Sequence, residues 1–170
     1  MTEYFLVTTW RLQAPIEAVW DAIYHSERWP LWWRYVKQVE DIKTGNRDGL
    51  HSVRRYTWRT CLPYTLRFDL LVTRIEPCVA FEAAVSGDLE GYGRCILSSD
   101  GPVTTVNYEW NVRTCLPWMN RLAPLAKPLF EWNHQRVMQL GGEGLSRWLT
   151  DRLAAARRTQ PRSSKKRIYR

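Results

Sequence analysis

Six consecutive segments of alternating apolar and polar side chains, separated by turn signals, constrain the fold of this chain most. They span residues 36–42, 50–59, 64–75, 79–85, 92–97 and 106–112. Alternation with a period of two predicts strands that bury one face, and short connections predict antiparallel neighbours. Residues 4–11 alternate in the same way. We therefore expect about seven strands in one antiparallel sheet.

Helical patterns flank this run of strands. Residues 14–23 predict a helix, because apolar residues recur there at helical spacing and Pro15 suits the first turn of a helix. Residues 27–33 indicate a second, short helix. Prolines at 117, 124 and 128 are expected to break the chain before a long helix from about 128 to 156. The order β-α-α-β6-α predicts an α+β fold in which a curved antiparallel sheet wraps around a long C-terminal helix.

Length, charge and cysteine spacing limit the classes of protein. The 170 residues suit one domain, and no apolar run approaches the ~20 residues of a membrane span. With no secretory leader pattern, we expect a cytoplasmic protein. The four cysteines never form a CxxC pair and only three histidines accompany them, so we expect no metal and no cofactor.

The net charge of +8 is concentrated at one end of the chain. Residues 157–170 hold seven Lys or Arg and no acidic residue, which leaves +1 for the rest. We predict a folded domain at 1–156 and a basic, disordered tail at 157–170. The tail could contact RNA, ribosomes or an anionic membrane, or could simply improve solubility.

Two compositional features bear on the core. Ten tryptophans indicate either heavy aromatic packing or a flat apolar surface kept for a ligand. Gly141, Gly142 and Gly144 lie within the predicted long helix, where each costs roughly 1 kcal/mol relative to Ala. Such a cluster predicts that the helix backbone approaches the sheet closely, or that the helix is kinked there.

Several segments resemble the START-like or polyketide cyclase/dehydrase (SRPBCC) superfamily, whose helix-grip fold is shared with the birch-pollen allergen. Residues 14–21 resemble its "AP-x-x-x-VW" opening, 29–33 its "W-x-x-WW" segment, and 91–94 with 105–110 its last hairpin. Residues 130–134, with Val137, Met138, Gly144 and Leu145, resemble an uncharacterised bacterial branch. The resemblance covers about residues 3–153. It implies a cavity between sheet and helix, but no common catalytic signature, because members include lipid carriers, quinone-binding proteins and aromatase/cyclases.

Nine residues are candidates for contact with a ligand in that cavity: Trp32, Trp33, Tyr56, Trp58, Arg94, Tyr108, Trp110, His134 and Met138. If Ile96 opposes Val106 across the hairpin at 100–102, Arg94 falls opposite Tyr108 and faces the cavity. Its guanidinium could then hold a carboxylate, phenolate or carbonyl oxygen. A one-residue change of register would turn Arg94 to solvent instead.

Two other positions leave alternatives open. Arg54 and Arg55 must face opposite sides of a strand, and we favour an inward Arg54 because Tyr56 and Trp58 share its parity; an exposed basic stripe is the alternative. His134, with Glu131 three residues earlier, could act as a general base, or could be structural. His134 and Arg94 are thus the catalytic candidates.

A five-residue repeat, Arg-Thr-Cys-Leu-Pro, occurs at 59–63 and 113–117, each time followed by an aromatic residue. Both copies should lie at one rim of the sheet, where they either frame the cavity mouth or merely end two strands. The sequence favours binding or transport of a hydrophobic or aromatic small molecule, lipid-, quinone- or polyketide-like. The alternatives are a cyclase, aromatase or dehydratase without a cofactor, and an interaction module that uses the basic tail on a ribosome, RNA or a chaperone.

Overall fold

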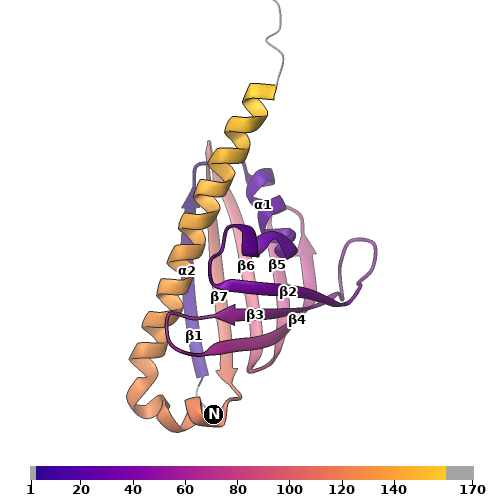
Figure 1. Ribbon diagram of the computed structural model, residues 1–170. Coiled ribbons are helices and arrows are strands. Elements are labelled where there is room, and N and C mark those ends of the chain that lie inside the picture. The colour runs from indigo at the N-terminus through magenta and orange to yellow at the C-terminus, as the bar shows by residue number, and fades with distance from the viewer. Residues whose placement is uncertain (1–2, 160–170) are drawn as a thin grey trace, which may run out of the picture.

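Seven antiparallel strands form one curved sheet in the order β1-β7-β6-β5-β4-β3-β2, and a long helix, α2, packs along it beside β1 (Figure 1). The computed structural model describes residues 3–159, apart from the side chains of residues 123, 124 and 159. The strands are β1 (Glu3–Leu12), β2 (Val36–Lys43), β3 (Val53–Arg59), β4 (Thr65–Glu76), β5 (Ala80–Gly87), β6 (Leu89–Asp100) and β7 (Val103–Thr114). The helices are α1 (Ile16–Tyr24), the 3₁₀ helix η1 (Ser26–Leu31) and α2 (Pro117–Thr159).

This architecture confirms the predicted fold class and order of elements. The strand alternation follows burial: Tyr56 and Trp58 of β3 and Phe68 and Leu70 of β4 are buried on the inner, concave face. The neighbouring residues Arg55 and Asp69 pair with each other on the outer face. One face of the sheet therefore supplies the core, and α2 with the two short helices covers it.

The bounds of α2 differ from the prediction at both ends. The helix begins at Pro117 instead of about residue 128, because a proline in the first turn has no helical hydrogen bond to lose. It continues through prolines 124 and 128, and it bends near its start, at the lower end of the view (Figure 1). At the other end it runs to Thr159, into the predicted tail, with Arg157 and Arg158 in the last turn, where cations are favourable. The remainder of that tail, 160–170, lies outside the described residues.

Two tryptophans fasten α2 to the rest of the molecule. The indole N–H of Trp33 donates to the carbonyl oxygen of Val137 at 3.0 Å, and that of Trp10 donates to the carbonyl oxygen of Met138 at 3.1 Å. Both accepting carbonyls lie one helical turn before a glycine. The absence of a side chain there opens the helix surface to a ring.

The glycine cluster makes this approach possible. A Cβ at Gly141 would collide with the Trp33 ring, one at Gly142 with the Trp10 ring, and one at Gly144 with the carbonyl oxygen of Trp32. The predicted close approach of the helix backbone is thus found, but it is made to the Trp10 ring of β1 and to the segment after η1 that contains Trp32 and Trp33. We call Trp10, Trp33 and the three glycines the tryptophan anchor.

Most of the tryptophans near η1 serve packing. Trp33 lies 5.2 Å from Trp10, 5.4 Å from Trp29 and Trp32, and 4.8 Å from Trp58, measured between ring centroids. This aromatic cluster fills the space between sheet and helix around the anchor. The most apolar space between sheet and helix lies towards the other end of α2, beside Met119, Phe130 and His134.

Candidate functional site: an apolar cavity beneath the first half of the long helix

A cavity of about 90 Å³ lies between the inner face of the sheet and α2. Its wall is mainly aliphatic and aromatic, with contributions from five strands, the 60–64 loop and the helix. The lining residues are Tyr4, Leu6, Trp58, Thr60, Tyr64, Leu66, Phe68, Leu89, Trp110, Val112, Thr114, Met119, Phe130, Asn133, His134 and Val137. An apolar cavity of about 150 Å³ admits benzene. The space here is smaller than that, so it matches part of a ring-sized or larger ligand.

Three polar side chains in this wall lack a hydrogen-bond partner among the described residues. They are His134, on both ring nitrogens, Tyr4 at its hydroxyl and Trp58 at its indole nitrogen. These atoms are shut off from solvent. A buried polar group without a partner costs about 1–3 kcal/mol. The cavity therefore presents unmet donors and an acceptor to anything that enters it.

The ionisable side chains of His134 and Tyr4 in this wall are neutral at pH 7. Burial lowers the pKa of His134 to about 4, so its imidazole is neutral at pH 7. Burial, and to a smaller extent Glu131, raises the pKa of Tyr4, which keeps its hydroxyl protonated. Among the residues that the structure describes, no Lys, Arg, Asp or Glu lines the cavity. Its electrostatic character is that of neutral dipoles in an apolar wall.

The nine predicted ligand-contact residues divide into three groups. Trp58, Trp110 and His134 line the cavity. Trp32, Trp33, Tyr56, Tyr108 and Met138 are buried in the core and do not line it. The third group is Arg94 alone, which lies on the opposite face of the sheet.

The predicted register around Arg94 is wrong by one residue. Cys95 lies opposite Tyr108, so Arg94 lies opposite Glu109 and faces outward. There it forms ion pairs with Glu82 at 3.1 Å and Glu109 at 3.8 Å. A side-chain period of two means that this shift moves the guanidinium to the other face. The cavity consequently lacks the cation expected to hold an anionic group.

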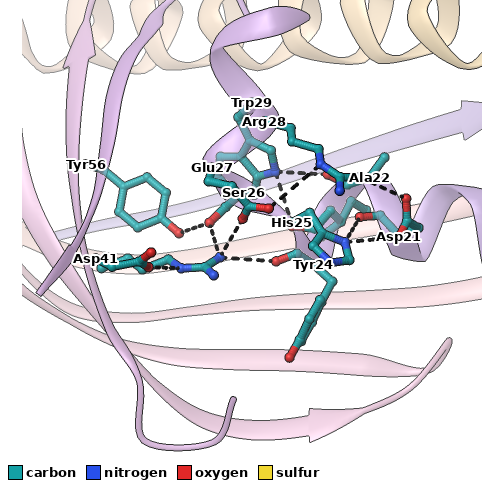
Figure 2. Close-up of polar contacts among 12 residues, drawn as sticks. Asp21, Ala22, Tyr24, His25, Ser26, Glu27, Arg28, Trp29, Asp41 and Tyr56 are labelled. Atoms are coloured by element: carbon teal, nitrogen blue, oxygen red, sulfur yellow. Dashed lines mark hydrogen bonds and ion pairs between the residues drawn. The ribbon is translucent and has the colours of Figure 1, made fainter. Parts of the chain in front are cut away.

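Arg54 faces inward, as predicted, but it binds protein groups. Its guanidinium lies 2.8 Å from Asp41 and 3.2 Å from Glu27, and donates to the Ser26 hydroxyl at 2.9 Å. Figure 2 shows Ser26 at the centre of these contacts, where it also accepts a hydrogen bond from Tyr56 at 2.7 Å. Arg54 thus fastens η1 to the sheet and does not line the cavity.

The two repeat copies meet at one end of the cavity. Thr60 and Thr114 are both buried in its wall, and each hydroxyl accepts a hydrogen bond from the backbone N–H two residues later, at 3.2 Å in both copies. The following aromatic residues, Tyr64 and Trp118, contact each other with ring centroids 5.4 Å apart. The prediction that both copies share one rim is confirmed, and they border the cavity.

Asn133 ties the first copy to the helix. Its side-chain oxygen accepts from the backbone N–H of Cys61 at 2.9 Å, and its nitrogen donates to the Tyr64 hydroxyl at 3.0 Å. Sequence reasoning missed Asn133, Tyr64 and Thr60 as site residues. The identity of the two repeats was the one signal that could have found Thr60, because a twice-used threonine suggests a turn with a specific geometry.

Two other kinds of site receive no support within residues 3–159. No group of three or more His, Cys, Asp or Glu gathers there in a way that could hold a metal ion. No helix in the same range is long and apolar enough to cross a membrane.

Comparison with known proteins extends the fold assignment. No protein-family model matches the chain, and no curated protein matches it. Among solved structures, the Zhui aromatase/cyclase from Streptomyces sp. R1128 has a TM-score of 0.76 at 13% identity, with 91% of this chain and 98% of that chain covered.

Two further structures agree. A START superfamily protein from Mycobacterium smegmatis has a TM-score of 0.71 at 15% identity, covering 86% of this chain and 97% of that one. Ginseng major latex-like protein 151 from Panax ginseng has a TM-score of 0.64 at 7% identity, covering 86% and 97%. The chain has the START-like, helix-grip fold of these proteins. At such identities the likeness extends to the fold alone.

Proposed function

We propose that this protein binds a small, uncharged, apolar molecule that carries a hydroxyl or carbonyl oxygen, and that it stores or transfers this molecule. The observation that carries the proposal is the uncharged cavity wall with unpartnered polar atoms on His134, Tyr4 and Trp58. An oxygen atom in the ligand would satisfy one or more of them and so offset the cost of burying these atoms without a partner.

The same wall argues against an anionic ligand. Moving a carboxylate out of water is expensive unless a cation or several donors compensate for it. Arg94 and Arg54 are both engaged elsewhere, on the outer face and at η1. A neutral phenol, alcohol or ketone therefore fits the cavity better than the corresponding acid.

A catalytic role in a cyclisation, aromatisation or dehydration is the alternative. His134 is placed in the cavity wall, but two features make it a weak general base. Its pKa is about 4, and its predicted partner Glu131 lies near Lys127 instead, at 3.9 Å. Binding needs no such group, so we place it first. The third alternative, contact with RNA or another partner through the basic tail, rests mainly on residues 160–170, which lie outside the described range. Loss of a partner in a salt-dependent manner on deletion of 157–170 would support it.

Small aromatic ligands of similar size test the proposal. We expect phenol and benzyl alcohol to shift the NMR signals of the Trp58 and Trp110 indoles in a saturable way, and benzoate to do so at least tenfold more weakly. His134→Leu should weaken phenol binding, whereas Arg94→Ala, on the outer face, should leave it unchanged. Equal affinity for benzoate and benzyl alcohol would refute the proposal. Native mass spectrometry of the protein from its own host, followed by organic extraction, would then identify the natural ligand, and conversion of that ligand would favour the enzyme.

A further inference from the structure

A second apolar space lies directly outside the cavity. This outer groove, of about 510 Å³, runs between the 62–64 loop and the first half of α2. Its lining residues are Leu62, Pro63, Tyr64, Trp118, Leu122, Ala126, Leu129 and Phe130. Among the described residues, none with a charged side chain lines it. It is thus chemically a continuation of the cavity wall.

Two aromatic side chains are shared by the walls of the two spaces. Tyr64 and Phe130 line both the cavity and the outer groove. Their ring centroids are 6.2 Å apart, and Trp118 lies 5.4 Å from Tyr64 and 6.2 Å from Phe130, all in edge-to-face arrangements. Rotation of such rings about their side-chain torsions would join the spaces without moving the sheet.

Size favours joint use of the two spaces. Pockets that hold small organic ligands measure roughly 300–1,000 Å³, and the cavity alone, at about 90 Å³, falls well short of that range. Cavity and outer groove together provide about 600 Å³. Meanwhile Trp118, Leu122 and Leu129 leave 42%, 49% and 47% of their surface in water, which is unfavourable unless something covers them.

We propose that the outer groove holds the hydrocarbon tail of the same ligand whose oxygen-bearing head occupies the cavity. This inference rests on the proposed function and narrows the ligand class to uncharged amphiphiles with a compact head and an apolar tail. The tail passes between Tyr64 and Phe130 and lies along Leu122 and Leu129. The head is held at His134, and the repeat turns frame the passage.

A series of 4-alkylphenols tests the inference, with 4-methylphenol, 4-butylphenol and 4-octylphenol as probes for the full-length protein. Full burial of a methylene would tighten binding roughly fourfold, so a half-covered tail should gain about twofold per methylene. From methyl to octyl we therefore expect the dissociation constant to fall about 100-fold. Quenching of tryptophan fluorescence provides the measurement, below the concentration at which the phenols aggregate.

Variants of α2 locate the tail. In Leu122→Ser/Leu129→Ser, and in Ala126→Phe, which fills the groove, 4-methylphenol should bind as in the wild type while the gain with chain length falls at least tenfold. Leu125→Ser is the matched control, because Leu125 is 91% exposed on the same helix and does not line the groove. It should retain the full gain.

The results separate this inference from the proposed function. If 4-methylphenol binds but longer tails bring no gain, or the groove variants keep the full gain, the tail site is refuted and the head site stands. If no alkylphenol binds, both fail. If the groove variants instead change the sedimentation coefficient and leave the chain-length gain intact, the groove is a surface for self-association and the tail site is wrong.

Discussion

Replacement of His134 by phenylalanine should remove most of the acid sensitivity that the cavity gives the fold. In the folded protein the pKa of His134 is about 4, against an ordinary value of 6.5. Between these values the unfolded chain binds a proton that the folded chain does not, so stability falls as the pH falls. The other titratable groups in the wall, Tyr4 and Tyr64, have raised pKa values and do not titrate below pH 7.

The magnitude follows from the size of the shift. One pKa unit corresponds to about 1.4 kcal/mol, and at pH 4.5 most of the shift of His134 is expressed, so about 2 kcal/mol of unfolding free energy is lost relative to pH 7.5. Urea denaturation at both pH values, for wild type and His134→Phe, measures the difference. We expect the loss between the two pH values to be about 2 kcal/mol smaller in the variant.

An equal acid-induced loss in wild type and variant would refute this reasoning. It would mean that the imidazole reaches water or a partner when the cavity opens. Following the His134 ring protons by NMR provides an independent check. They should not titrate between pH 7 and pH 5 in the folded protein.

Three further predictions concern the anchor, the outer face and the loop tie. Gly144→Ala should destabilise the protein by about 1–3 kcal/mol in urea denaturation, because the added Cβ collides with the Trp32 carbonyl oxygen. Glu143→Ala, at the exposed neighbouring position, is the control and should change stability little. Higher stability of Gly144→Ala would contradict the close approach. Arg94→Ala should lower the free energy of unfolding by less than about 1 kcal/mol, as expected for partly exposed ion pairs on the outer face. A larger loss would indicate a role beyond these pairs. Asn133→Leu should lower the free energy of unfolding by about 1–3 kcal/mol, because it leaves the Cys61 N–H without its acceptor. It should also speed amide hydrogen exchange in the 60–64 loop. Unchanged exchange would show that Asn133 does not hold this loop.

The sequence was sufficient for the strands and their order, because alternation and turn residues are local signals. The sequence was insufficient to fix the register between neighbouring strands. The one-residue difference that turns Arg94 outward depends on how the hairpin at 100–102 closes, with Asp100 opposite Val103. The start of α2 was misplaced for a related reason. A proline is compatible with a helix start as well as with a helix break, and the choice between them depends on tertiary packing, such as the burial of Met119 in the first turn.

The cavity itself was only partly predictable. The alternation of side chains along β3 and β7 correctly placed Trp58 and Trp110 on the inner face of the sheet. Tyr56 and Tyr108 lie on the same face but are packed in the core, so alternation alone does not distinguish a cavity wall from solid core. The difference arises from α2, which is held against the sheet at the tryptophan anchor. Its first half leaves a gap where the Tyr64 and Phe130 rings meet. Spacing along one chain does not report that distance.

The tryptophan anchor also divides the molecule by its tolerance of sequence change. At Gly141, Gly142 and Gly144 any side chain collides with a ring or a backbone oxygen, so these positions are closed to variation. Leu122 and Leu129 are half exposed and fasten nothing. Mutations in the first half of α2 could therefore change which ligand is bound, while the tryptophan anchor at its second half maintains the fold. Such a division lets a scaffold acquire new ligands by drift at one end, without passing through unfolded intermediates.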